Sequence, residues 1–274
     1  MIEKAIMTTF VLSFPLAGLL LLLLSLRWRQ KNVYARLRQE QDHFVGRVAT
    51  GAEQWFTPPT TLPYFSRRLA SLNGFLPLPI LEHLRAVVAG TRQDERSYIP
   101  GHKQGGTISY EHLHRLAPEL VAFYQSQVLR ELVSNVVGVP VVNTPLHDQS
   151  SCSLLVYDRP RDHIGWHFDH NFYRGRHFTV LLCLVNEDRV HGGLSSAHLQ
   201  ARIDGAEEII PTPPNTLVIF EGAQVLHRVT GLGPEQTRIQ LSMTFCTDPS
   251  APWFKSVIRR IKDTAYFGVR ALWT

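Results

Sequence analysis

The sequence predicts a mainly β domain, a sandwich or barrel of antiparallel strands, with helices before it. From residue 151 onward, short apolar runs are separated by turns, and they lie at residues 154–157, 178–185, 194–203, 216–220 and 237–246. Strands at this spacing are typical of such folds. Upstream, residues 118–137 carry a wide apolar stripe at helical spacing, which predicts a helix that packs on something large.

The last of these strands indicates where a core and a pocket would lie. Apolar and polar residues alternate along it, with Ile239, Leu241, Met243 and Phe245 set against Arg238, Gln240, Ser242 and Thr244. Alternation puts the two sets on opposite faces of a strand. A polar face normally means solvent, but here it equally suits a pocket lining, with the upstream helices covering the apolar face.

Three helices are predicted before residue 151. Residues 78–89 show helical periodicity, and the helix over 118–137 begins near Pro118 and ends at Gly138, residues that suit a first turn and a helix exit. Residues 27–56 are polar with apolar residues at helical spacing, which predicts a stalk. Three prolines then break the chain, at positions 58, 59 and 63.

Residues 5–26 form an apolar segment of 22 residues without a charge, long enough to span a bilayer as a helix. Pro15 lies within it, which a membrane helix tolerates. A cleaved signal peptide is the alternative, but the run is long for one, and Arg27 and Arg29 follow it instead of small residues. We therefore expect a retained anchor that contacts the lipid bilayer through residues 5–26.

Basic residues flank this segment unequally. Lys4 alone precedes it, whereas five follow closely, at positions 27, 29, 31, 36 and 38. The positive-inside rule then predicts a single-pass membrane protein with its C-terminal domain in the cytoplasm. Three cysteines give no disulfide framework, which agrees with a reducing compartment. The membrane-flanking cluster also explains the net charge of +5, so no nucleic-acid partner is expected.

Two further segments each have more than one interpretation. Residues 99–107 are polar and glycine-rich but lack the spacing of a phosphate-binding loop. They predict a flexible surface loop, with a substrate-side lid as the alternative. The tail, residues 253–273, interleaves basic and aromatic side chains. It predicts a basic amphipathic helix that either closes one side of the domain or rests on a membrane surface.

A histidine and an aspartate two residues apart, His167 and Asp169, lie between two strand-like runs. Such a pair supplies two of the three protein ligands of a non-haem iron site when a second histidine joins it. His227, beyond the strand that ends at Phe220, is the best candidate. Spacing alone does not exclude three nearby competitors, His163, His170 and His177.

Several motifs around this pair occur in a familiar order. They are Tyr157, the His167-x-Asp169 pair, Arg176-x-x-Thr179 before a strand, Gly192-Gly193, the strand ending at Phe220, His227 with Arg228-Val229, and Arg238. Over these residues, about 90 in all, the chain resembles the 2-oxoglutarate and Fe(II)-dependent dioxygenases, particularly their prolyl 4-hydroxylase-like branch. The resemblance implies a double-stranded β-helix, also called a jelly roll.

The resemblance also implies the ligands of the site. Fe(II) would be bound by His167, Asp169 and His227, with 2-oxoglutarate and O2 as cosubstrates and ascorbate as an optional addition. Arg238 would bind the far carboxylate of 2-oxoglutarate, because a planar guanidinium matches its two oxygens. Tyr157 and Thr179 would add hydroxyl hydrogen bonds. Many members of the branch have a lysine where this chain has Arg238. The arginine-x-serine pattern of another branch is also absent, because Gln240 stands two residues after Arg238.

The leading hypothesis is a membrane-anchored enzyme that couples conversion of 2-oxoglutarate to succinate and CO2 with hydroxylation of a second substrate. The alternatives are a non-catalytic cupin-like binding or scaffold protein with a structural metal, and a zinc hydrolase, against which Arg238 argues. No motif identifies the second substrate as a protein, a lipid or a small molecule. The predicted divisions are an anchor (1–26), a juxtamembrane helix and linker (27–62), a helical support region (63–150), a catalytic core (151–247) and a C-terminal helix (248–274).

Overall fold

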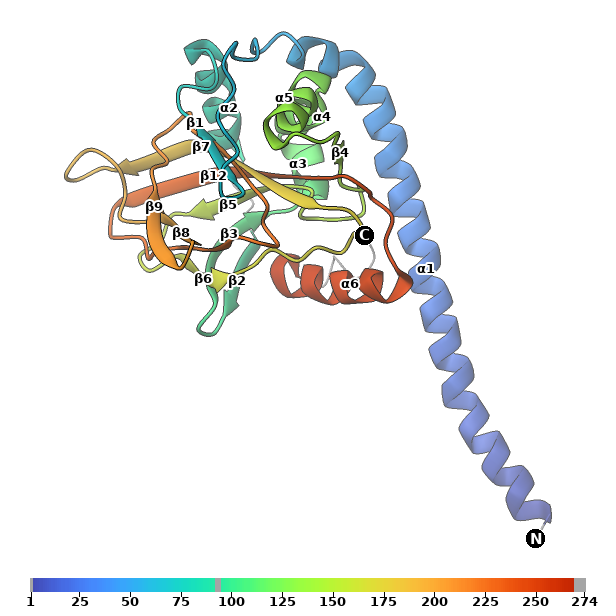
Figure 1. The fold of residues 1–274 in the computed structure, drawn as a ribbon. Coiled ribbons are helices and arrows are strands. Elements are labelled where there is room, and N and C mark those ends of the chain that lie inside the picture. Colours follow the sequence, from blue (N-terminus) through green and yellow to red (C-terminus); the bar gives the residue numbers. More distant parts are fainter. Residues whose placement is uncertain (1, 92–94, 269–274) are drawn as a thin grey trace.

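The computed structural model describes residues 2–91 and 95–268, without the side chains of residues 2–16, 40–42, 44–50 and 253. Within this part, twelve strands form one antiparallel sheet (Figure 1). The strands are β1 (Leu69–Leu72), β2 (Glu95–Ile99), β3 (Lys103–Ile108), β4 (Val142–Asn143), β5 (Cys152–Tyr157), β6 (His163–His167), β7 (His177–Asp188), β8 (Leu199–Ile203), β9 (Ala206–Ile210), β10 (Leu217–Phe220), β11 (Leu226–Val229) and β12 (Gln236–Cys246).

The sheet curls so that its two halves face each other. One half has the order β1-β10-β7-β12-β5, the other has the order β6-β11-β8-β9, and β3 pairs with both β5 and β6. Leu181 and Phe220 of the first half pack with Leu199 and Val229 of the second in one apolar cluster. The predicted mainly β, antiparallel fold is confirmed, and the curled sheet is consistent with a jelly roll.

Helices cover the outer face of the first half (Figure 1). Leu241, Met243 and Phe245 of β12 share the main core with Leu120 and Phe123 of the helices. The apolar face of the last strand is therefore covered by the upstream helices, as its alternation predicts. Between β1 and β4 the chain forms the helices α2 (Leu78–Gly90), α3 (Tyr110–Leu116), α4 (Pro118–Gln125) and α5 (Gln127–Val137).

The single helix predicted over residues 118–137 is wrong, because the chain forms two helices there. Ser126 separates α4 from α5 in an extended conformation, with φ −60° and ψ 140°. Its hydroxyl donates to the carbonyl oxygen of Phe123 at 2.7 Å, which satisfies an acceptor at the end of α4. Both helices pack on the same core, so the apolar stripe continues across the break.

The glycine-rich segment is a strand, and the predicted flexible surface loop is wrong. β2 and β3 form a hairpin, and β3 lies between β5 and β6, where most of its residues are buried. A Cβ atom on Gly105 would stand 3.4 Å from the carbonyl oxygen of Val156 and 3.6 Å from the ring of Tyr157. These are ordinary contact distances, so this glycine lies in packed surroundings and does not indicate mobility.

Strands of the second half are the ones least visible in the sequence. β6 and β9 lie outside the predicted runs, and β8 occupies only the end of the run over 194–203. β6 mixes polar and apolar residues, and β9 is a mostly exposed edge strand that pairs only with β8. Their hydrogen bonds to neighbouring strands, and not an apolar pattern, define them.

A long helix, α1 (Ile2–Ala52), leads into the domain and includes most of the stalk predicted over 27–56 (Figure 1). Ala52, at its end, is completely buried. Within the described part of the chain, no helix combines the length and the apolarity needed to cross a membrane. The side chains of residues 2–16 lie outside that part, so the anchor at residues 5–26 stays a prediction.

The tail forms α6 (Trp253–Phe267), which lies against β2 and β3 (Figure 1). Its inner face is polar: Arg259 and Asp263 are buried and form an ion pair at 3.1 Å. Lys262 donates to the hydroxyl of Ser150 at 2.6 Å. The helix thus packs on one side of the domain, in agreement with the first of its two predicted roles.

Candidate active site

Three side chains meet where β6 and β11 lie side by side. His167 ends β6 and stands opposite His227 of β11 in the antiparallel pairing, and Asp169 follows two residues after His167. The Nε2 atoms of the two imidazoles lie 3.6 and 3.8 Å from Oδ1 of Asp169. All three ligand atoms lie within 4.8 Å of one another, so a single metal ion can bind all three.

The backbone orients both imidazoles in the same way. Nδ1 of His167 lies 2.8 Å from the carbonyl oxygen of Gly165, and Nδ1 of His227 lies 2.9 Å from that of Val225. A carbonyl only accepts, so each Nδ1 carries the proton and donates, which leaves the Nε2 lone pair for a metal. Burial lowers the pKa of His227, which favours this neutral form. Burial also lowers the pKa of His167, but the hydrogen bond and charge of Asp169 raise it above its ordinary value.

Asp169 is held from two sides. Oδ2 accepts a hydrogen bond from the hydroxyl of Thr179 at 2.5 Å, and its backbone N–H donates to the carbonyl oxygen of Gly222 at 2.9 Å. Burial acts to raise the pKa of Asp169, but His227, His167 and Thr179 together bring the pKa well below its ordinary value. The carboxylate is therefore ionised, the form that binds a metal.

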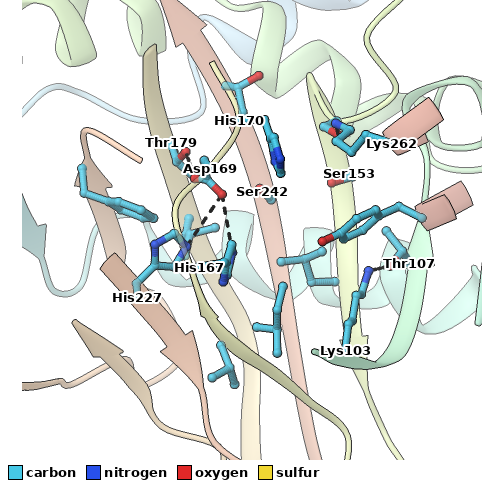
Figure 2. Close-up of a pocket in the computed structure, with 18 of the residues that line it drawn as sticks. Lys103, Thr107, Ser153, His167, Asp169, His170, Thr179, His227, Ser242 and Lys262 are labelled. Carbon is cyan, nitrogen blue, oxygen red and sulfur yellow. Dashed lines mark hydrogen bonds and ion pairs between the residues drawn. The ribbon is translucent and has the colours of Figure 1, made fainter. Parts of the chain in front are cut away.

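The three ligands line a cavity of about 140 Å³ (Figure 2). Its other wall carries Lys103 and Thr107 of β3, with Tyr266 and Lys262 of α6. Ser242 and Thr244, on the polar face of β12, also line the cavity. The predicted polar face of the last strand therefore lines a pocket. The remaining lining residues are Asp148, Ser150, Ser153, Leu155, Tyr157, Ile164, His170, His177, Thr179, Leu181, Leu199, Phe220, Val229 and Phe267.

The competing histidines do not join the three ligands within the described residues. His170 and His177 line the cavity, but neither belongs to the cluster. His163 lies at the start of β6, and its Nδ1 donates to the carbonyl oxygen of Arg161 at 2.8 Å. The choice of His167 over its neighbours is decided by the pairing of β6 with β11.

No family model and no curated protein matches the sequence, but solved structures match the fold. A 2OG-Fe(II) oxygenase family protein from Burkholderia pseudomallei gives a TM-score of 0.54 at 11% identity, over 69% of this chain and 89% of its own. A prolyl hydroxylase from Trichoplax adhaerens, in complex with a hypoxia inducible factor peptide, gives 0.52 at 13% identity, over 78% and 92%. A non-heme α-ketoglutarate-dependent epimerase from nogalamycin biosynthesis gives 0.53 at 11% identity, over 74% and 80%.

The chain has the fold of the 2-oxoglutarate and Fe(II)-dependent oxygenases. Identities this low establish a shared architecture and leave the activity to be argued from the residues of the site. Within this fold, His167 and His227 lie on the adjacent strands β6 and β11, and Asp169 lies two residues beyond the end of β6. The cavity extends from these three residues towards β12 and α6.

Arg238 lies inside the curled sheet, beside the cavity. It is completely buried and occupies the same face of β12 as Ser242 and Thr244, but it is not among the residues that line the cavity. Nη1 donates to the hydroxyl of Thr212 at 2.8 Å, whereas Nε and Nη2 have no hydrogen-bond partner among the residues that the structure describes. Burial lowers the pKa of this guanidinium, and no acidic side chain is among the groups that raise it.

The two hydroxyl residues implied by the resemblance have different surroundings. Tyr157 lines the cavity and stands opposite Arg238 in the pairing of β5 with β12, so it is a cross-strand neighbour of the arginine. Thr179 also lines the cavity, but its hydroxyl is engaged with Asp169. Thr179 therefore orients a metal ligand in this oxygenase fold.

Sequence reasoning missed Gly222 and Lys103. Gly222 lies just after β10, against the metal ligands: a Cβ atom there would clash with Asp169 and would stand 2.6 Å from Oγ1 of Thr179. The sequence does offer a signal for Gly222, because this glycine directly follows Phe220-Glu221 at the end of an apolar strand. Lys103 had no such signal, because its segment reads as a polar loop.

Replacing Gly222 by alanine is expected to weaken metal binding about 10–100-fold, the range for groups that orient metal ligands. The new methyl group would displace the carboxylate of Asp169 or the hydroxyl of Thr179. Calorimetric titration with Zn(II) measures the effect. Gly231→Ala is a matched control, because its nearest neighbour would be Cα of Arg161 at 4.0 Å. Equal affinities for the two variants would contradict the assigned role of Gly222.

Proposed function

We propose that this protein is an Fe(II)- and 2-oxoglutarate-dependent oxygenase that hydroxylates a second substrate. The observation that carries the proposal is the convergence of His167, Asp169 and His227 on one point at the wall of a cavity. Two imidazoles and one carboxylate with open positions on one side are the ligand set of non-haem Fe(II) oxygenases. The shared fold supports the same reading.

The residues fit the metal. Two neutral imidazoles and one ionised carboxylate leave a bound Fe(II) with a net positive charge, which suits an anionic cosubstrate. Hydrogen bonds from Thr179 and to the carbonyl oxygens of Gly165 and Val225 orient all three ligands before the metal arrives. Such supporting contacts are typical of functional metal sites.

The residues also fit an anionic cosubstrate. A buried guanidinium with two unpartnered nitrogens is costly when no carboxylate compensates its charge. Arg238 is in this condition, and a carboxylate would supply both missing acceptors in a bidentate way. Tyr157 stands opposite it in the pairing of β5 with β12 and lines the cavity, so a neighbour of the arginine borders the space beside the metal ligands.

Each residue of the site would have a distinct role in this reaction. His167, Asp169 and His227 hold the metal, Thr179 orients Asp169, and Arg238 with Tyr157 holds the far carboxylate of 2-oxoglutarate. Bound there, the metal and its cosubstrates supply the oxidation, in which substrate C–H, 2-oxoglutarate and O2 become C–OH, succinate and CO2. The apolar lining residues, Leu155, Ile164, Leu181, Leu199, Phe220 and Val229, exclude water from this side of the cavity.

The test is succinate formation by the purified protein with Fe(II), ascorbate and 2-oxoglutarate. We expect slow succinate release without a second substrate and none under anaerobic conditions. Anaerobic binding of 2-oxoglutarate that depends on the metal supplies a second readout. A protein that binds metal but neither binds nor consumes 2-oxoglutarate would instead be a binding protein with a structural metal.

We also propose that the chain is anchored to a membrane through residues 5–26 and that α6 rests on the surface of that membrane. The uncharged segment and its basic flank support the anchor. The support for α6 is an outward strip of Phe254, Val257, Ile258 and Ile261, which are 47–65% exposed at helical spacing. An exposed apolar strip on a helix suits the boundary of a lipid surface.

Cell fractionation tests the anchor. The full chain is expected in the membrane fraction after alkaline carbonate extraction, and its C-terminal domain should be cleaved by protease only after the cytoplasmic side is opened. Ile258→Asp combined with Ile261→Asp should then reduce binding of a chain lacking residues 1–26 to anionic vesicles. Release of the full chain by carbonate would contradict the anchor.

A further inference from the structure

Lys103 faces the cavity from the wall opposite the three metal ligands (Figure 2). It is the first residue of β3, and only 2% of its surface is exposed. Its Nζ donates to the hydroxyl of Thr107 at 2.7 Å and lies 4.5 Å from the centre of the Tyr266 ring. The ammonium group is therefore enclosed between β3 and α6, at the edge of the space that a ligand would fill.

No acidic side chain neutralises this ammonium group. Within the described residues Lys103 forms no ion pair, and the charged side chain that acts on its pKa is the cation Lys262. The two acidic side chains of the cavity have other partners. Asp148 contacts Lys262 and Tyr173, and Asp169 contacts the two metal-binding histidines. Burial first, and Lys262 second, lower the pKa of Lys103 to about 7.

A lysine in this position is a poor structural residue. One hydroxyl and one aromatic face satisfy only part of an ammonium group, which has three donors. An uncompensated buried charge costs several kcal/mol, and methionine or leucine would fill the same space without that cost. The arrangement is explained if the cavity receives an anion that supplies the missing acceptors.

We propose that Lys103, supported by Thr107 and Tyr266, binds an acidic group of the substrate that is oxidised. The assignment to that substrate rests on the proposed function, in which Arg238 already holds the far carboxylate of 2-oxoglutarate. The ligand of Lys103 would then be a carboxylate or similar anion on the second substrate. The three metal ligands and Lys103 line the same cavity, so one molecule anchored at Lys103 could present a C–H bond to the metal.

Acetate is the probe for this site, with Zn(II) as the metal because it is diamagnetic and has no redox chemistry. Titrations followed by NMR compare the wild type with Lys103→Met and with Lys255→Met, a control whose Nζ bonds only backbone carbonyls outside the cavity. When Zn(II) and 2-oxoglutarate are saturating, we expect acetate binding to weaken about 10–100-fold in Lys103→Met, because one charge-assisted hydrogen bond is lost. The affinity for 2-oxoglutarate should stay within about threefold.

Other outcomes identify what has failed. If 2-oxoglutarate binding weakens in Lys103→Met while acetate binding does not, the lysine serves the cosubstrate and the substrate assignment is overturned. If neither anion distinguishes Lys103→Met from the control, Lys103 binds no anion. Should the wild type not bind 2-oxoglutarate at all, the proposed function fails, and acetate titration of the metal-free protein still decides whether Lys103 is an anion site.

The pH dependence of acetate binding provides a second arm. Because burial and Lys262 lower the pKa of Lys103 to about 7, the cation that binds acetate is present below that pH and is lost above it. The affinity should fall up to about tenfold per pH unit above this value in the wild type and not in Lys103→Met. The groups facing Lys103 are Lys262 and Tyr266 of α6, His167 of β6 and His102 of the β2–β3 turn, so the variant controls for their titration.

Stability separates an anion site from a structural lysine. Removing an uncompensated buried charge is expected to leave the melting temperature of the ligand-free protein unchanged or higher. Lys103→Arg, which keeps the charge, should retain part of the acetate affinity. A melting temperature several degrees lower for Lys103→Met, with acetate binding unchanged, would make Lys103 a structural residue and overturn the proposal.

Discussion

Asp169→Asn is expected to abolish succinate formation and to weaken metal binding by more than about 100-fold, beyond the effect of altering a group that only orients a ligand. The carboxylate is the one anionic ligand of the three, and its pKa lies well below the ordinary value because the facing imidazoles outweigh burial. An amide at this position fills the same space but carries no charge, so a divalent ion loses its only neutralising partner.

The measurement has two parts. Succinate is quantified under saturating Fe(II) and 2-oxoglutarate, and Zn(II) affinity is measured by calorimetry. Asp204→Asn is the control, because Asp204 is an exposed turn residue with φ 51°, a conformation that asparagine tolerates. Succinate formation by Asp169→Asn at the rate of this control would remove the proposed metal site.

Arg238→Met is expected to weaken 2-oxoglutarate binding about 10–100-fold, which corresponds to losing a hydrogen bond to a charged group, while metal affinity stays unchanged. At the same time the ligand-free protein should be as stable as the wild type or more so, because the substitution removes a buried charge whose Nε and Nη2 have no partner. These opposite effects distinguish a ligand-binding arginine from a structural one. Arg238→Lys should recover part of the affinity, since it restores the charge without the bidentate geometry.

Binding is measured anaerobically with Fe(II) present, and stability by thermal unfolding without ligand. Arg189→Met is the matched control, because that arginine is exposed and pairs only with Glu187. If Arg238→Met loses stability while its affinity for 2-oxoglutarate is unchanged, the arginine serves to hold Thr212 and the cosubstrate is bound elsewhere.

Much of the first half of the sheet could be predicted from the sequence. β12 alternates because its outer residues face the helices and its inner ones face the cavity, and β7 has an unbroken apolar run over residues 180–185 because both its faces are buried there. Such patterns are local, so they can be read without knowing the partner strands. The pairing of His167 with His227 came from a family resemblance, and their opposition in β6 and β11 agrees with it.

The errors share a physical cause. β3 contains two adjacent glycines and a lysine, and it is a strand because β2, β5 and β6 supply its hydrogen bonds. The break at Ser126 leaves no mark in the apolar stripe, because α4 and α5 pack on one core. β-structure depends on contacts between distant segments more than on the preferences of its own residues. A local sequence pattern does not reveal such contacts.

From the sequence alone follow the antiparallel fold, the helical cover and the candidate ligands, because periodicity and residue chemistry are properties of short segments. Folding alone brings Gly222 against Asp169, leaves two nitrogens of Arg238 unpaired, and encloses Lys103 opposite the metal ligands. Each of these depends on distances between segments that lie tens of residues apart in the chain. For Lys103 the change is largest: in a polar loop it would be an ordinary solvated cation, and inside the curled sheet it becomes a charge that requires a ligand.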